Sequence, residues 1–198
     1  MDYRIAAVVP VLLLLASTAM AQEFKARPAD APQVDRPKAF SANGLAFKYP
    51  GNWNAVSHEQ VEGSSCYNVY LEADKTEFEV LNLDAHVIAC QNADAPVPRE
   101  YVDYLVTATQ TDDGGEYDRT EVLSRQYGKH ELFAAHYQNE VEAVGPLYSQ
   151  HLVMVGSAAC GGEWTCYAYT QNLQANEPMA GKAFALILDT VKYSPTNE

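Results

Sequence analysis

The sequence predicts an α+β domain in which an antiparallel sheet of six to eight strands is flanked by helices. Two segments, 98–109 and 177–190, repeat apolar residues at helical spacing, whereas several others alternate apolar and polar residues as half-buried strands do. Tight turns separate the strands of the second half, which is typical of an antiparallel meander. These turns are predicted at Gly128-Lys129, Gly145-Pro146 and Gly161-Gly162.

Residues 1–21 have the features of a secretory signal peptide. An uncharged apolar run, 5–16, is followed by Ala19-Met20-Ala21, which matches the small-residue pattern of a signal-peptidase site. The run has twelve residues, whereas a helix that crosses a membrane needs roughly 20. We therefore expect an exported protein, periplasmic or secreted, with no membrane span after the signal is removed.

The remaining chain divides into a leader and one domain. Residues 22–39 contain three prolines and few apolar side chains, which predicts a flexible leader. The domain is expected at 40–195. Its first strand alternates Leu45, Phe47 and Tyr49 with residues of the opposite face, and a turn at 50–52 follows.

Four cysteines in an exported protein predict two disulfides. Three pairings are possible, and the spacing favours Cys66–Cys90 with Cys160–Cys166. A hairpin tip at Gly161-Gly162 would place Cys160 opposite Cys166. Strands at 66–72 and 79–90 would bring their apolar faces together if Cys66 lay opposite Cys90. A zinc site is the alternative, but no C-x-x-C pair or finger-like spacing occurs.

The second half of the chain is predicted to form four strands between two helices. The strands are expected at 119–127, 130–141, 147–157 and 164–170, after a polar turn at 112–116. Asn176 is the predicted N-cap of the last helix. The expected buried stripes are Tyr101, Tyr104, Leu105 and Ala108 in the first helix, and Ala180, Ala183, Phe184, Ile187, Leu188 and Val191 in the second.

Both ends of the domain resemble PsbP-like domains. The phrase FSANGLAFKYPGNW, at 40–53, resembles the first hairpin of that family, and ILDTVKY, at 187–193, is similar to its closing phrase. The resemblance covers about 40–195 and is closest to a bacterial exported, DcrB-like branch. It implies an α/β/α sandwich and a role in binding or assembly, and it transfers no ligand residue to this chain.

Two groups of residues are candidates for binding chemistry. Asp84 and His86 lie two apart on one strand, so their side chains share a face, where Tyr70 or Glu72 could complete a small metal or proton-transfer site. The alternative is an ordinary polar sheet face. A second candidate for a divalent cation is the acidic turn formed by Asp112, Asp113 and Glu116. It lacks the spacing of an EF-hand, so a solvated turn is the alternative.

The remaining polar residues fit no catalytic motif. His130 and His136 form H-E-x4-H rather than the H-E-x-x-H of a metalloprotease, and His136 is interpreted as a partly exposed sheet residue. His58, Glu59 and Glu62 are interpreted as loop or short-helix surface. The sequence contains no G-x-S-x-G. Aromatic residues near the predicted hairpin, Trp164, Tyr167 and Tyr169, would suit a protein or glycan partner, with sheet packing as the alternative.

The charge balance excludes one class of function. With 13 basic and 26 acidic residues the net charge is −13, so the chain is not expected to bind nucleic acid. We expect an exported, non-enzymatic binding or assembly factor whose partner is a protein or complex of the bacterial envelope, and no resident cofactor. The alternatives are a divalent-cation or small-ligand binding protein and a hydrolase with a non-sequential active site. The sequence does not indicate an oligomeric state.

Overall fold

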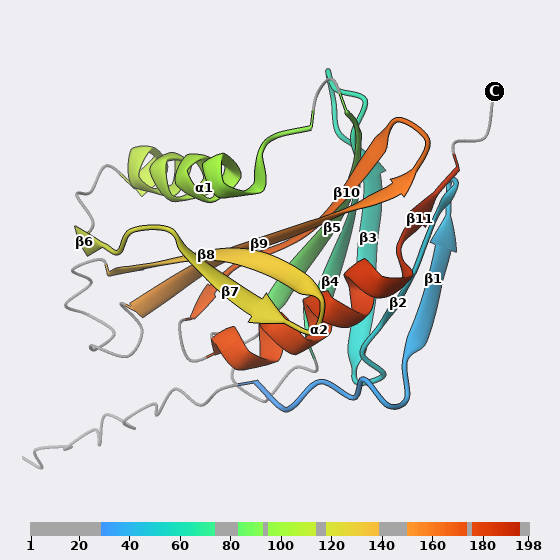
Figure 1. The fold of residues 1–198 in the computed structure, drawn as a ribbon, viewed down its shortest axis with the longest axis horizontal. Coiled ribbons are helices and arrows are strands. Elements are labelled where there is room, and N and C mark those ends of the chain that lie inside the picture. The colour runs from blue at the N-terminus through green and yellow to red at the C-terminus, as the bar shows by residue number, and fades with distance from the viewer. Residues whose placement is uncertain are drawn as a thin grey trace, which may run out of the picture.

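An eight-stranded antiparallel sheet forms the centre of the molecule (Figure 1). The structure is a computed structural model and describes residues 29–73, 83–92, 95–113, 118–138, 150–173 and 176–194. In spatial order the large sheet consists of β3 (Trp53–Gln60), β4 (Tyr67–Ala73), β5 (Asp84–Gln91), β10 (Trp164–Leu173), β9 (Gln150–Gly161), β8 (His130–Gln138) and β6 (Asp118–Arg119), and β7 (Leu123–Tyr127) also pairs with β8. A three-stranded sheet contains β1 (Lys38–Ala42), β2 (Leu45–Tyr49) and β11 (Lys192–Tyr193).

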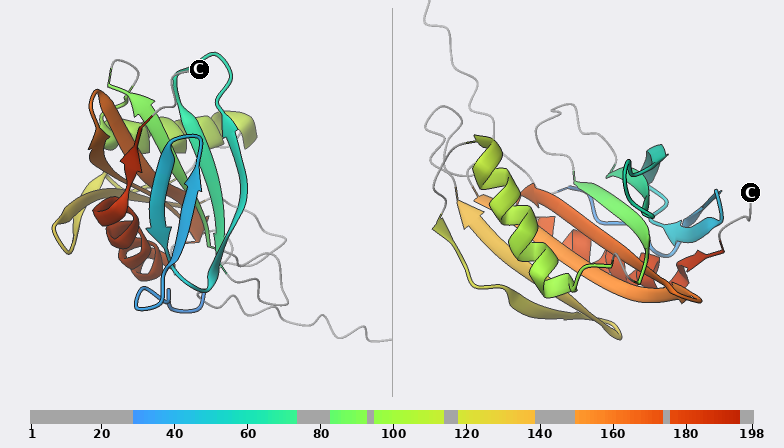
Figure 2. Two further views of the ribbon diagram at one scale, coloured as in Figure 1. Left: turned by 90° about the vertical axis from the view of Figure 1, so that its right-hand side faces the viewer. Right: turned by 90° about the horizontal axis from the view of Figure 1, so that it is seen from above.

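A helix packs on each face of the large sheet, and Figure 2 shows the two helices on opposite sides. On one face, α2 (Glu177–Thr190) and the small sheet bury the apolar side chains of the strands, among them Val69, Val87 and Leu132. On the other face, Val102, Leu105 and Val106 of α1 (Pro98–Asp113) pack against Ile88, Val153, Val155 and Tyr167. The predicted α+β class, with a large antiparallel sheet and two helices, is therefore present.

Two glycines let α2 lie close to the sheet. A Cβ on Gly156 of β9 would lie 2.2 Å from Leu132 and 2.8 Å from Leu188 of α2. A Cβ on Gly181 of α2 would lie 2.1 Å from the ring of Tyr127 on β7. Neither contact leaves room for a methyl group, so both positions need glycine for its small size.

The strand predictions need three corrections. First, the expected strand at 119–127 is broken into β6 and β7, because Val122 turns inward and is buried between them. Second, residues 53–60 form β3, where no strand was predicted, so His58 and Glu59 are strand residues and not loop or helix surface. Third, β9 and β10 continue past the predicted ends at 157 and 170. The predicted turn at Gly145-Pro146, with the rest of 139–149, lies outside the described residues.

The helix predictions differ in their details. The second helix and its buried stripe are as predicted. In α1, however, Val102, Leu105 and Val106 form the buried stripe, and Tyr104 is 64% exposed. Aliphatic side chains fill the interface, while the Tyr104 hydroxyl stays in water. Asn176 makes no side-chain capping bond, because its Oδ1 accepts the backbone N–H of Ala29 at 2.7 Å.

Both disulfides are those that the spacing favoured. Cys66 and Cys90 join β4 to β5, on the face that carries α1, and Cys160 and Cys166 join β9 to β10. The hairpin that holds the second pair differs from the prediction. Its turn is Gly162-Glu163, and a bulge places Ala158, rather than Cys160, opposite Cys166. Cys160 is the extra residue of the bulge, and Gly161 next to it has a φ of 143°, which favours glycine.

The described part of the predicted leader packs against the domain. Ala29 is buried beside the start of α2, and the Gly51 N–H donates to the carbonyl of Gln33 at 3.0 Å. The chain then enters β1, which pairs with β2 through a turn at Asn43 and Gly44, both with positive φ. Residues 1–28, which contain the predicted signal peptide, lie outside the described residues.

Candidate functional site

The candidate pair Asp84 and His86 lies on β5, in the half of the large sheet that α1 does not cover. The strand register places Tyr70 opposite His86 and Glu72 opposite Asp84, so these four side chains share one face. The next strands extend this row with Ser57 on β3 and Tyr169 on β10. Helix α1 packs against β8 and β9, away from β3 and β4 (Figure 1). We call this surface the acidic–aromatic face; its residues are Glu59, Tyr70, Glu72, Asp84, His86 and Tyr169.

The His86 ring is held between two tyrosines. It stacks on Tyr169 with ring centroids 4.7 Å apart and an interplanar angle of 7°, and the Tyr70 ring lies 5.2 Å away. Burial lowers the pKa of His86, so the neutral ring is favoured. Its Nδ1 lies 3.3 Å from Oδ1 of Asn68, which accepts a hydrogen bond from the tautomer that carries the proton on Nδ1. His86 is therefore a fixed neutral ring at neutral pH.

The tyrosines around His86 are also held in the neutral form. Burial raises the pKa of Tyr169, and burial together with a hydrogen bond to Asp84 raises the pKa of Tyr70. Tyr101 of α1 packs edge-on against Tyr169, with centroids 5.4 Å apart, and stacks against the exposed ring of Tyr104 at 6.0 Å. These phenols offer hydrogen-bond donors and ring faces rather than an acid or base that titrates near neutral pH.

The strands that form this face contribute carboxylates and no basic side chains. Glu59, Glu72 and Asp84 lie on β3, β4 and β5, and the sequences of these strands and of β10 contain no Lys or Arg. Lys38 of β1 lies at the border of this face, where its Nζ donates to the carbonyl of Trp53 at 2.7 Å and to Oδ1 of Asn54, opposite Glu72, at 3.1 Å. Carboxylates next to ring faces attract ammonium and guanidinium groups. The arrangement is therefore suited to basic side chains.

Neither cation candidate forms a site among the described residues. No group of three or more His, Cys, Asp or Glu side chains in the described chain is placed to hold a metal ion. Asp112 and Asp113 belong to the last turn of α1 and not to a loop, because the helix continues four residues beyond its predicted end. Their side chains, like Glu116, lie outside what the structure describes.

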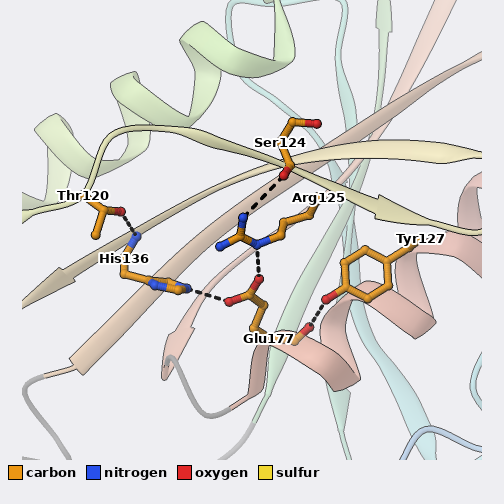
Figure 3. Close-up of polar contacts among 6 residues, drawn as sticks. All are labelled: Thr120, Ser124, Arg125, Tyr127, His136 and Glu177. Carbon is orange, nitrogen blue, oxygen red and sulfur yellow. Dashed lines mark hydrogen bonds and ion pairs between the residues drawn. The ribbon is translucent and has the colours of Figure 1, made fainter.

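A second polar cluster lies at the start of α2 and was not predicted (Figure 3). The Glu177 carboxylate accepts Nε of Arg125 at 2.8 Å and lies 2.6 Å from Nε2 of His136. The Tyr127 hydroxyl donates to the Glu177 carbonyl at 3.5 Å. The side chains of Glu177, Arg125 and His136 are 16%, 33% and 19% exposed. This cluster ties β7 and β8 to α2, so His136 has a structural partner.

His130 has a different partner at the other end of α2. Its Nε2 lies 2.9 Å from Oδ1 of Asp189, which also accepts Nζ of Lys129 at 2.9 Å. These hydrogen bonds, from Lys129 first and His130 second, lower the pKa of Asp189. His130 and His136 therefore bind opposite ends of the helix and do not form a metal-binding pair. This agrees with the sequence analysis, in which their spacing did not match the metalloprotease motif.

Two open depressions flank β6. One, of about 300 Å³, is lined by residues that include Arg119, Thr120 and His136; the other, of about 430 Å³, lies between α1 and the segment after β6. Arg119 pairs with Asp103 across this region at 2.9 Å. Neither lining brings a Ser or Cys nucleophile next to a base.

The described structure is thus an α+β protein with one acidic–aromatic sheet face, and comparison with solved structures finds a similar fold. The solution structure of cyanobacterial PsbP (CyanoP) from Synechocystis sp. PCC 6803 is 11% identical, with a TM-score of 0.45; the match covers 80% of this chain and 92% of that one. A crystal structure of a Bacteroides thetaiotaomicron protein is 11% identical, with a TM-score of 0.40, over 81% of this chain and 50% of that one. The first of these two proteins is itself named a PsbP protein. Comparison with protein-family models and curated proteins gave no match.

Proposed function

We propose that this chain is an exported, non-enzymatic accessory protein that binds a basic segment of an envelope protein through the acidic–aromatic face. The observation that supports this proposal best is the stacked pair of His86 and Tyr169 beside Glu72 and Asp84, on strands that contain no Lys or Arg. Charged groups of one sign, gathered on one surface, favour a partner of the opposite sign.

The physical basis of binding is a rigid surface with rings and carboxylates in fixed positions. A Lys or Arg side chain placed over the half-buried Tyr70 would gain a cation–π contact and reach a neighbouring carboxylate. The Cys66–Cys90 disulfide joins β4 to β5 on the same face. Little conformational entropy is therefore lost when a partner binds there.

Two further observations fit export. The sequence begins with the features of a signal peptide, and the two disulfides are compatible with an oxidising compartment. Within the described residues, the helices are all too short or too polar to cross a membrane.

The test is binding of a labelled peptide of about ten residues that alternates Lys and Val, with an alternating Glu and Val peptide as the control for charge. The variant E59Q/E72Q/D84N removes three charges from the face. Its matched control, D35N/E121Q/E163Q, removes three charges from exposed positions elsewhere. We expect the face variant to bind the Lys peptide about tenfold more weakly than the wild type does, and the control variant to bind it like the wild type. High salt should weaken the binding of this peptide to both variants.

Equal affinities of the two variants would overturn the proposal, because the attraction would then come from net charge alone. The dialysed protein also tests the divalent-cation alternative. A rise in melting temperature with Ca²⁺, Mn²⁺ or Zn²⁺ that the face variant abolishes would favour a cation as the ligand of this face.

A further inference from the structure

We infer that the basic segment binds as an additional strand along the outer edge of β3. This inference rests on the proposed function and specifies the form of the partner. The geometry points to an extended peptide because β3 is the last strand of the large sheet in the described chain. An edge strand offers a row of backbone donors and acceptors to another strand.

The exposure of β3 differs from that of its neighbour β4. Residues Asn54–Gln60 are all exposed, whereas β4 alternates buried and half-buried residues along its whole length. A strand that is exposed on both sides and lies at a sheet edge has room for another chain beside it. Figure 2 shows β3 at the rim of the sheet, with the small sheet stacked on one face rather than beside the edge.

The ladder between β3 and β4 fixes which backbone groups point outward. Val61 N–H donates to the carbonyl of Cys66, and Ala73 N–H donates to that of Leu83 on the β5 side. Because bonded and non-bonded pairs alternate in an antiparallel ladder, these two bonds direct the N–H and C=O groups of Ala55, His58 and Gln60 away from β4.

Lys38 of β1 occupies the start of this edge, where it donates to the carbonyl of Trp53, but the rest of the edge has few of the features that normally prevent strand addition. The sequence of β3 contains no Pro and no Lys, and its one interruption is a bulge at Val56. The bulge leaves Val56 53% exposed, as an apolar contact near the middle of the edge.

The two sides of the edge predict the pattern of the partner. On one side, an added strand would lie beside Ser57 and Glu59 of the acidic–aromatic face. On the other side it would lie beside His58 and Phe40, whose rings are 5.7 Å apart. Because side chains alternate along a strand, the matching partner alternates basic and apolar residues.

Charge favours a foreign segment over a second copy of this chain. Two copies paired edge to edge would join two acidic faces, and each copy carries a net charge of −13. A basic segment removes this repulsion and pairs with Glu59.

Hydrogen exchange followed by NMR tests the inference on the full folded protein. The probes are the alternating Lys–Val peptide and a helix-forming Lys–Ala peptide of equal length and charge. We expect the Lys–Val peptide alone to slow exchange of the His58 and Gln60 amides, by about tenfold at saturation. The variant H58P removes one outward N–H and should bind about tenfold more weakly than H58L, which loses the same imidazole and keeps the amide.

The outcomes separate the two proposals. If both peptides bind at the face and neither protects the β3 amides, strand addition is wrong and the proposed function stands. If neither peptide binds, both proposals fail. A sedimentation change to a dimer, with protection of β3 in the absence of peptide, would replace the basic segment with a second copy. Should H58P fail to fold, A55P beside A55S provides the same comparison at another outward amide.

Discussion

The two ends of the large sheet differ in the surroundings of their carboxylates. At the end formed by β7 and β8, the Glu177 carboxylate has Arg125 and His136 as direct partners. At the end formed by β3, β4 and β5, Glu72 and Asp84 have an aromatic and neutral setting on strands without Lys or Arg. We call these the paired end and the acidic end.

This comparison separates the polar groups that stabilise the fold from those that are suited to bind a partner. A half-buried carboxylate that binds a guanidinium and an imidazole within the chain has its interactions satisfied, and it fixes the position of α2. Asp84 is instead hydrogen-bonded to the phenol of Tyr70, a neutral partner that leaves the negative charge of the carboxylate in place. Both ends contain a histidine, and the role of each histidine is determined by its neighbours.

The largest expected effect concerns the covalent link at the acidic end. Cys66 and Cys90 close a loop of sequence separation 24, against 6 for Cys160 and Cys166. In the loop-entropy model, removal costs about 3.5 kcal/mol for the first pair and about 2.4 kcal/mol for the second. Urea unfolding of the two double Cys→Ser variants measures both values. Equal losses would show that the acidic end depends no more on its disulfide than the β9–β10 hairpin does.

The next effect tests the paired end. Glu177→Ala removes the shared acceptor of Arg125 and His136, and we expect a loss of about 2 kcal/mol in the free energy of unfolding. Glu131→Ala is the matched control, since this exposed carboxylate of β8 accepts only the hydroxyl of Ser124 among the described contacts, and we expect a change of about 0.5 kcal/mol or less. If both variants lose the same free energy of unfolding, the cluster at the start of α2 stabilises the fold no more than an exposed hydrogen bond does.

Local patterns explain what the sequence could predict. The helix α2, the pairing of β4 with β5 and both disulfides follow from periodicity and parity within short segments. Strand β3 escaped prediction because it is exposed on both sides and so shows no alternation of apolar residues. The hairpin of β1 and β2 did leave a signal, since Asn43-Gly44 is a preferred two-residue turn.

Contacts between distant segments explain what the sequence could not predict. Glu177 is 52 residues from Arg125 and 41 from His136, and no local spacing links them. The stack of His86 on Tyr169 depends on β5 pairing with β10, which the sequence pattern does not specify. The sequence indicated the candidate pair Asp84 and His86, with Tyr70 nearby, because these residues lie on strands adjacent in the chain. It did not indicate Tyr169 as a partner of His86, because β10 is distant in sequence.

The smallest effect is a pH dependence at the acidic end. Burial lowers the pKa of folded His86 below the 6.5 of an exposed histidine, so the unfolded chain takes up this proton first as the pH falls. The stability that comes from the neutral ring is complete above pH 6.5 and is lost as the pH falls from 6.5 through the folded pKa. His86→Phe keeps a ring against Tyr169 and removes this titration. We therefore measure the free energy of unfolding of both proteins between pH 5 and 8. The wild type should lose more stability than His86→Phe on the acid side. Parallel curves would show that the neutral form of His86 does not contribute to the stability of this face.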